Sequence, residues 1–334
     1  MKTDTTAGAA GTADLVLRPY AGEADLAAIV GLQNTELAAD GIRERLSIGD
    51  LEPVYRNASN AFDARRDVLL AEIAGQVVGT VRVDWVDTSD GLREFRSSGW
   101  VDPEWRRRRI GSRLLDAAQR LIAERAREQP TDRPLMLGTW ADEKQLGKAA
   151  LARSMGYEPA RWFFEMERAA IDGELPEIPP MPAGLELRPV GRAEARALWD
   201  ADHEAFRDHW GGNEDSVASF QRWVEAPEFQ PENFLVAYDG EEIAGAVLNV
   251  IYHTENAELG MRRAWLDSVF TRRPWRGRGL ARALIVRSFH LLAGLGMDTA
   301  ALGVDADNPS GALRLYESCG FVVSERGAAW RKPM

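Results

Sequence analysis

Cysteine is almost absent from this sequence. Cys319 is the only cysteine among 334 residues, so no disulfide can form within one chain. This composition fits a reducing compartment, and we expect a cytoplasmic protein. Apolar runs long enough to cross a bilayer are also missing, which argues against a membrane-spanning helix. Residues 1–13 are small and polar and lack the apolar core of a signal peptide, so we expect a disordered tail there.

Positively charged residues are fewer than negatively charged ones. The chain has 41 Lys and Arg residues against 52 Asp and Glu residues, and its formal net charge is −11 at pH 7. A nucleic-acid or anionic-membrane partner requires a basic surface, so this balance argues against both. The arginine clusters in the sequence therefore serve local purposes. The P-loop string, Gly followed by four residues and Gly-Lys-Ser/Thr, is absent as well.

One stretch, residues 266–289, has the order strand, turn and helix. Its first residues are apolar or β-branched, as in a strand, and apolar residues recur at helical spacing after the turn. The turn contains Gly277 and Gly279, which let the backbone approach a ligand. The first helical turn offers unpaired N–H groups to an anion, so the stretch predicts a phosphate cradle. Three arginines surround the cradle: Arg276, Arg278 and Arg282.

Two phosphate-binding patterns can be compared with this turn. The dinucleotide fingerprint fails, because its third glycine position is Arg282 and the acidic Asp298 begins the next apolar run instead of ending it. The pattern Arg/Gln-x-x-Gly-x-Gly/Ala fits fully, through Arg276, Gly279 and Ala281. Taken alone, the loop is also compatible with a glycine-rich surface turn that caps a solvated helix.

A second segment, residues 308–321, supports the interpretation of the loop as a phosphate-binding turn. Asn308-Pro309 opens a turn, Ser310 is a suitable helix cap, a short helix carries Tyr316, and Gly320-Phe321 ends that helix. In this order and spacing, the loop and the segment resemble the pyrophosphate loop and the last segment of the GNAT superfamily of N-acetyltransferases. The resemblance is strong from about residue 185 to residue 334.

The two parts of the chain repeat one another. Residues 15–20 recur as 185–190, the hairpin at 69–83 recurs at 235–250, and the stretch 100–115 parallels the strand, turn and helix of residues 266–289. We therefore expect an α/β fold of two tandem GNAT-like domains, each with a mostly antiparallel mixed sheet, a splayed strand pair and flanking helices. The expected boundaries are a tail at 1–13, a first domain at 14–171, a Pro-rich linker at 172–184 and a second domain at 185–334.

The first copy departs from the family pattern. Arg109 replaces the loop glycine, Ala152 stands at the position of Tyr316, and residues 141–144 replace the Asn-Pro turn. A side chain at the glycine position would crowd a pyrophosphate held by the backbone. The arginine run 106–109 is compatible with weak phosphate binding or with a solvated turn. We expect a degenerate first domain and a catalytic second domain.

The resemblance implies how an acyl donor would bind. The donor would be acetyl-CoA, used as a substrate, and no metal is expected. The strand before the loop would splay from its neighbour and pair with the amide-bearing arm. Tyr316 would be the general acid that protonates the departing thiolate. The implied donor-binding residues are Val269, Phe270, Thr271, Arg276, Gly277, Arg278, Gly279, Leu280, Ala281, Arg282 and Asn308.

The general base is left open by the sequence. Asp267 shares a strand face with Trp265 and lies near the expected thioester position. Glu204 lies in a segment that shapes the acceptor pocket in this family, together with His203 and His209. Acidic and aromatic residues in that segment suit a cationic amine. Either carboxylate, or a relay of water molecules, would serve as the base.

The tandem arrangement, with a degenerate first half, is similar to bacterial two-domain GNAT proteins of the mycothiol synthase type. In that type a substrate-binding Glu stands where this chain has Trp265, so the same acceptor does not follow. We expect transfer of an acetyl group to a primary amine of a small molecule or peptide, by a monomer or homodimer. A non-catalytic acyl-CoA sensor with the same fold is the alternative, and a dinucleotide-dependent oxidoreductase is more distant.

Overall fold

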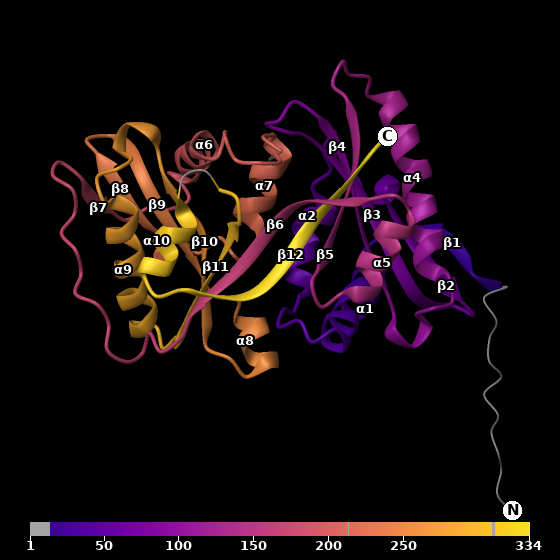
Figure 1. Ribbon diagram of the computed structural model, residues 1–334, viewed down its shortest axis with the longest axis horizontal. Helices are drawn as coiled ribbons and strands as arrows, with labels where there is room; N and C mark the ends of the chain where they lie inside the picture. The colour runs from indigo at the N-terminus through magenta and orange to yellow at the C-terminus, as the bar shows by residue number, and fades with distance from the viewer. Residues whose placement is uncertain (1–13, 213, 309–310) are drawn as a thin grey trace, which may run out of the picture.

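The computed structural model describes residues 14–212, 214–308 and 311–334, which form two halves that share one sheet (Figure 1). The tail expected at 1–13 and the cap expected at Ser310 lie outside the described residues. No helix in the described ranges is long and apolar enough to cross a membrane.

The first half runs from β1 to β6. Its elements are β1 (Val16–Pro19), α1 (Ala24–Ala39), α2 (Ile48–Arg56), α3 (Ala64–Asp67), β2 (Val68–Ile73), β3 (Gln76–Asp87), β4 (Arg93–Val101), the 3-10 turn η2 (Pro103–Trp105), α4 (Ile110–Glu128), β5 (Leu135–Asp142), α5 (Leu146–Ser154) and β6 (Glu158–Arg168).

The second half runs from β7 to β12. Its elements are β7 (Glu186–Arg188), α6 (Ala195–Ala205), α7 (Val217–Glu225), η3 (Pro231–Asn233), β8 (Leu235–Asp239), β9 (Glu242–Val250), α8 (His253–Leu259), β10 (Arg263–Thr271), η4 (Arg273–Trp275), α9 (Leu280–Gly294), β11 (Thr299–Asp305), α10 (Ala312–Ser318) and β12 (Val322–Pro333).

The strands of the described residues form a single twelve-stranded sheet in the order β1-β2-β3-β4-β5-β12-β6-β11-β10-β9-β8-β7. Only the pairs β4–β5 and β10–β11 are parallel, and the other neighbours are antiparallel. Both predicted hairpins are present, and their turns contain Gly75 and Gly240 with positive φ. The expected mixed α/β fold with mostly antiparallel sheets is confirmed.

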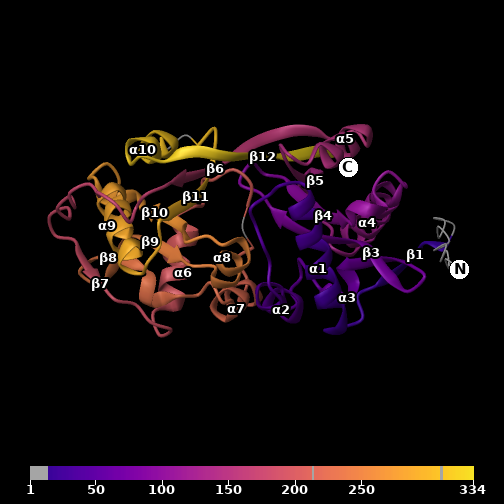
Figure 2. The same ribbon diagram turned by 90° about the horizontal axis from the view of Figure 1, so that it is seen from below.

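The last strand of each half extends into the other half. β6 pairs with β11 through Arg168↔Ala300 to Phe163↔Asp305, and β12 pairs with β5 through Gly327↔Asp142 to Pro333↔Met136. Both strands cross between the halves along one side of the molecule, where α5 and α10 also lie (Figure 2). The division at 14–171 and 185–334 stays a prediction, and the exchange of terminal strands is a feature that it did not contain.

The linker expected at 172–184 has neither helix nor strand. It is fastened to the second half: Arg287 donates to the Pro179 carbonyl at 2.7 Å, and Asp172 forms an ion pair with Arg262 at 3.0 Å. It runs along the outer side of the β7 and α9 end of the molecule (Figure 1).

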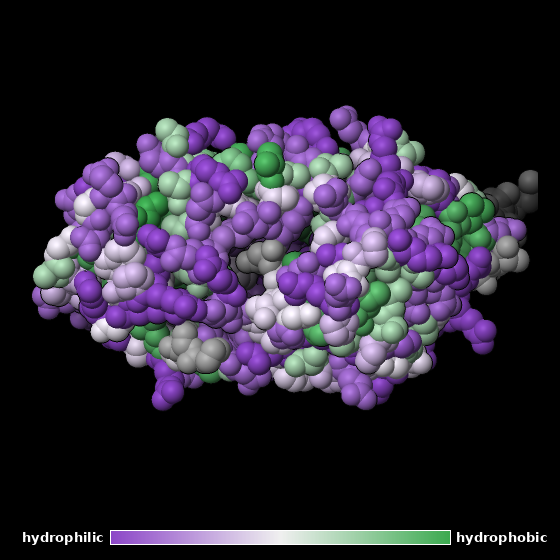
Figure 3. Space-filling view, turned by 90° about the horizontal axis from the view of Figure 1, so that it is seen from above, coloured by the Kyte–Doolittle hydropathy of each residue, from purple (hydrophilic) through white to green (hydrophobic). Residues whose placement is uncertain are grey.

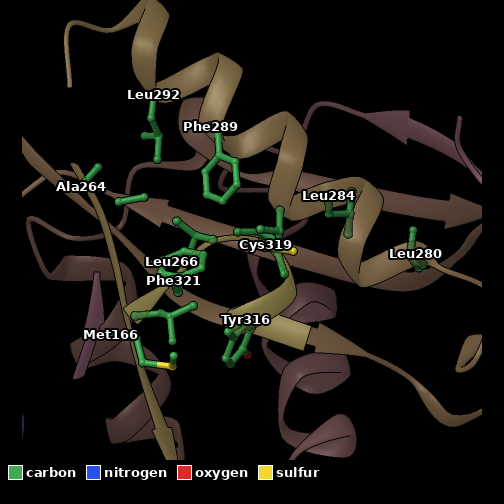
Figure 4. Close-up of a cluster of buried hydrophobic side chains, with 14 of the residues drawn as sticks. Met166, Ala264, Leu266, Leu280, Leu284, Phe289, Leu292, Tyr316, Cys319 and Phe321 are labelled. Carbon is green, nitrogen blue, oxygen red and sulfur yellow. The ribbon is translucent and has the colours of Figure 1, made fainter. Parts of the chain in front are cut away.

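The core of the second half positions the loop before α9. Four apolar side chains of this helix, three to five residues apart, face the strands and contact residues such as Ala264 and Leu266 (Figure 4). They are Leu280, Leu284, Phe289 and Leu292. Burying each of these large side chains contributes about 1.5–3 kcal/mol, so the start of α9 is held firmly against β10.

The expected splay of strands is present in both halves. The parallel pairing of β10 with β11 ends at Trp265↔Ala301, although both strands continue for several residues. In the first half the pairing of β4 with β5 likewise ends at Ser97↔Thr139. Each half thus has two strands that part from one another and leave backbone edges without a strand partner.

Candidate functional site

The turn before α9 has the backbone of an anion cradle. Gly277 and Gly279 have φ values of 76° and 83°, in the left-handed region that glycine adopts without strain. A Cβ atom at either position would meet nothing within 4 Å, so open space lies beside the backbone there. Gly279 is the N-cap of α9, whose first N–H groups lack partners within the helix. Together these features leave the turn and the helix N-terminus open to an anion.

A cavity of about 310 Å³ lies along this turn. Tyr316, Leu315 and Ala205 contribute to its wall. Nine of the eleven predicted donor-binding residues line it: Val269, Phe270, Thr271, Arg276, Gly277, Gly279, Leu280, Ala281 and Arg282. Of the other two, Arg278 is exposed and Asn308 lines a neighbouring cavity. We call this space the donor cavity.

The free edge of β10 borders the donor cavity. Beyond Trp265, the strand pairs with β9 alone, so alternate backbone N–H and C=O groups point into the gap that β11 leaves. A bulge interrupts the β9 pairing between Leu266 and Ser268, and Asp267 is the additional residue. An extended chain with amide groups can pair with such an edge.

A larger cavity of about 670 Å³ lies between the two halves. Its wall includes Trp100 and Trp140 from the first half, Glu165 from β6, and Trp265 and Asp267 from β10. The molecular surface is hollowed between the halves (Figure 3). We call this space the interdomain cavity.

The two cavities meet at one place. Five residues line both of them: Phe206, His209, Val269, Ala312 and Tyr316. A molecule in the donor cavity and a molecule in the interdomain cavity would therefore face each other at this junction. The sequence predicted Val269 and Tyr316 for such a place.

Tyr316 lies on α10 and is only 7% exposed. Its ring packs at the edge of the core beside Phe321, at 6.1 Å between ring centroids (Figure 4). Burial raises the pKa of its hydroxyl to about 12, so the hydroxyl keeps its proton at neutral pH. It is therefore a proton donor at the junction.

Asp267 opens onto the interdomain cavity, where its side chain is exposed to solvent. The cavity walls exclude part of the water around its carboxyl group, which raises the pKa of Asp267 above its ordinary value of 3.8. Among the described residues, no cation forms an ion pair with Asp267 and no hydrogen bond to its carboxyl group is found. Asn308, which also lines this cavity, places its Nδ2 atom 3.5 Å from Nε2 of His209.

The structure places Glu204 elsewhere. Nε and Nη2 of Arg272 donate to one of its carboxylate oxygens at 2.9 and 2.6 Å, and Glu204 lines neither the donor nor the interdomain cavity. His203 is stacked on Trp199 at 4.0 Å and is likewise absent from both walls.

From the sequence, His209 was expected only as one member of the segment that shapes the acceptor pocket. It lines both cavities at their junction, and burial lowers its pKa below 6.5, so the ring is neutral at pH 7. Its segment was expected to shape the acceptor pocket, but no spacing rule singles out one of its two histidines.

The first half keeps the shape of the loop without its glycines. Arg107 and Arg109 have φ values of 62° each, at the positions of Gly277 and Gly279. Arg106 is held by Asp40 through two hydrogen bonds of 2.7 and 2.8 Å. The Leu151 side chain would lie 3.2 Å from a Cβ atom at Gly111, the position that matches Ala281. In the first half, side chains thus stand beside the loop backbone at positions where the second half has glycine and open space.

Both halves match models of one protein family. The model described as "Acetyltransferase (GNAT) family" matches residues 194–321, and "Acetyltransferase (GNAT) domain" matches residues 64–159. Mycothiol acetyltransferase of Geodermatophilus obscurus is 29% identical over 313 residues, 92% of this chain and 94% of that protein. The enzyme of that name from Thermobifida fusca is 31% identical over 240 residues, 67% of this chain and 70% of that protein.

Solved structures share the tandem architecture. A GCN5-related N-acetyltransferase from Sphaerobacter thermophilus superposes with a TM-score of 0.69 at 25% identity, covering 96% of each chain. A tandem GNAT protein from the clavulanic acid biosynthesis pathway superposes with a TM-score of 0.70 at 19% identity, covering 96% of this chain and 98% of its own. The second likeness concerns the fold alone.

Proposed function

The chain belongs to the GNAT family of acetyltransferases, and on that basis we propose that it moves the acetyl group of acetyl-CoA to a primary amine, with the chemistry in the second half. The observation that carries this proposal is the junction of two cavities at Tyr316 and Val269. One cavity has the features of a pyrophosphate and pantetheine site, and the other is open to an acceptor.

The donor cavity would hold the acyl donor largely through backbone. The N–H groups of the turn at Gly277–Gly279 and of the first turn of α9 would bind the pyrophosphate, and Arg276 and Arg282 would add positive charge. The free edge of β10 at Val269 would pair with the amides of the arm. A backbone N–H of this edge would polarise the thioester carbonyl, as in an oxyanion hole.

The transfer step then uses two groups at the junction. The neutral amine attacks the thioester carbonyl carbon, a C–N bond forms, and the C–S bond breaks. The proton lost by the attacking nitrogen goes to a base, for which we propose Asp267, directly or through water. Tyr316 donates its proton to the thiolate of the departing CoA, whose conjugate acid has a pKa of about 8.5 if it resembles a cysteine thiol.

We favour Asp267 over the other sequence candidate. Its carboxyl group lines the interdomain cavity and has no ion-pair partner among the described residues, whereas Glu204 is bonded to Arg272. A burial-raised pKa brings a carboxylate closer to the operating pH, which improves it as a base. His209 is the competing base, since it is neutral and lies at the junction.

The experiment is a thiol-release assay with acetyl-CoA against a panel of amines. The panel contains amino acids, polyamines, aminoglycosides, peptides and the amine precursor of mycothiol, because relatives are named mycothiol acetyltransferases. We expect CoA release that depends on one class of amine. CoA binding without release for any amine would favour the alternative, a non-catalytic acyl-CoA sensor. The position of Tyr316 favours the enzyme, because a pure binder does not need a proton donor there.

A further inference from the structure

Six Phe and Trp side chains line the interdomain cavity, and both halves of the molecule contribute to them. They are Trp100, Trp140, Phe163, Phe164, Phe206 and Trp265. Carboxylates also line this cavity, among them Glu44 and Asp142. Every amine can carry the same positive charge, so the carboxylates do not separate one amine from another. The aromatic rings, in contrast, favour an acceptor of a particular shape.

Trp140 lies on β5, and its indole ring reaches over the neighbouring strand β12. In the sheet, β12 stands between β5 and β6, and Gly327 of β12 is aligned with Phe163 of β6. A Cβ atom at Gly327 would lie 2.2 Å from Cζ2 of Trp140, so the indole occupies the space that a side chain would fill. Glycine at this position allows the ring to pack directly on the strand backbone.

Phe163 continues this apolar surface beyond Gly327. Its ring lies 5.4 Å from the ring of Trp140 between centroids, at an interplanar angle of 53°. Trp140 is still 44% exposed, although β12 covers one side of its ring and Phe163 lies beside it. A large aromatic side chain that is held in place and open to a cavity offers a rigid surface to a second ring. We call Trp140 and Phe163 the aromatic platform.

The aromatic platform leads toward the junction of the two cavities. Phe163 is aligned with Asp305, the last residue of β11, and its ring lies 6.0 Å from that of Trp210. Trp210 follows His209 in the chain, and His209 lines both cavities. A molecule whose amine lies at the junction can therefore extend across Phe163 onto Trp140.

We propose that the acceptor is a small primary amine that carries a planar aromatic ring on a short chain, and that this ring stacks on the aromatic platform. The inference rests on the proposed acetyl transfer, which places the reacting amine at the junction. In this arrangement the first half selects the acceptor, although its own donor loop is degenerate. Trp140 and Phe163 determine specificity and are not catalytic, because they contact the ring of the acceptor and not the reacting atoms.

The first experiment compares acceptors that differ in shape. Phenylalkylamines of increasing chain length are paired with linear alkylamines that have the same number of carbon atoms, and CoA release is measured for each. We expect kcat/KM for the best phenylalkylamine to exceed that of its linear partner by about 3- to 10-fold. This is the range that aromatic stacking contributes beyond the burial of apolar area.

The second experiment changes the aromatic platform. Trp140→Ala should lower kcat/KM for the phenylalkylamine about 10- to 100-fold, mainly through KM, and should affect the linear alkylamine much less. Trp140→Phe should restore most of the loss. Gly327→Ala should act in the same direction as Trp140→Ala, because the added methyl group displaces the indole. Trp162→Ala is the matched control: Trp162 is 43% exposed on β6 but lines neither the interdomain nor the donor cavity, so its loss should change neither acceptor.

The outcomes separate this inference from the proposed function. If linear alkylamines are acetylated as efficiently as phenylalkylamines, or if Trp140→Ala lowers both equally, the aromatic platform is overturned while acetyl transfer stands. Calorimetry with the phenylalkylamine covers the opposite case. Binding that Trp140→Ala weakens and Trp162→Ala does not, without CoA release from any amine, would support the aromatic platform and overturn the transferase. Failure to bind any phenylalkylamine would overturn the inference.

Discussion

At the scale of the residue, the protonation states at the junction follow from burial. Burial favours the neutral form of every group, so it keeps the proton on Tyr316 and leaves His209 without one. The same effect raises the pKa of Asp267, which makes its carboxylate a better proton acceptor. An acid and a base can therefore coexist beside one reaction centre.

Replacing Tyr316 by Phe should lower kcat by roughly a hundredfold or more, as expected for a lost general acid. The ring packing beside Phe321 is retained, so the KM for acetyl-CoA should stay nearly unchanged. Steady-state kinetics on a verified acceptor measures both values. Tyr238→Phe removes a hydroxyl outside both cavities and serves as the control. Unchanged turnover in Tyr316→Phe would remove this residue from the mechanism.

The pH dependence of kcat should reveal Asp267. A base must be ionised, so kcat should fall as the pH decreases through the raised pKa of Asp267, which lies above 3.8. No loss from Tyr316 deprotonation is expected below about pH 11, because the pKa of its hydroxyl is raised to about 12. Asp267→Asn should lower kcat about 10²- to 10⁴-fold and abolish the acidic limb. A larger loss in His209→Gln or Glu204→Gln than in Asp267→Asn would contradict the assignment.

At the scale of the element, the backbone conformation of the turn before α9 determines whether it can bind an anion. Its two glycines adopt left-handed backbone, and the apolar stripe of the helix fixes the turn beside β10. The first half shows that arginine can adopt the same backbone, at Arg107 and Arg109. What differs between the halves is therefore the space beside the backbone.

Gly279→Glu should abolish CoA binding without unfolding the protein. The carboxylate would block and repel the pyrophosphate, and the left-handed conformation would cost about 1–2 kcal/mol of stability. Gly296→Glu is a matched control, because Gly296 has the same φ of 83° and open space around it but lies after α9. Both variants should lose similar stability in thermal melts, and only Gly279→Glu should lose CoA binding in calorimetry. Wild-type affinity in Gly279→Glu would show that the loop assignment is wrong.

At the scale of the whole molecule, we expect the two halves to differ in function, although one sheet joins them. We expect one tight acetyl-CoA per chain, bound between Val269 and Tyr316, and at most one weak site near residues 106–109. In the first half, Arg106 is already paired with Asp40, and Leu151 covers Gly111. A weak site held by charge should disappear at moderate salt. Calorimetry that counts two sites of similar affinity would overturn this division of roles.

The shared sheet should make the halves unfold together. β6 pairs with β11 and β12 of the second half, and β12 pairs with β5 and β6 of the first half, so neither sheet is complete alone. Phe95→Ala removes a side chain that is 1% exposed in the first half and should cost about 3–5 kcal/mol. We expect one cooperative calorimetric transition at a lower Tm. A separate, unshifted transition for the second half would indicate independent domains.

The sequence alone determined the features that depend on local pattern. The loop at 276–282, the two hairpins and the repeat follow from glycine position and apolar periodicity, because turns and amphipathic elements are specified by near neighbours. Only the tertiary structure decided which residues meet across long separations. It exchanged the terminal strands, paired Glu204 with Arg272, brought His209 to the junction and put Glu44 and Asp142 into the wall that Asp267 shares. These contacts depend on how the halves pack around a common cavity, and no period or spacing along the chain encodes that packing.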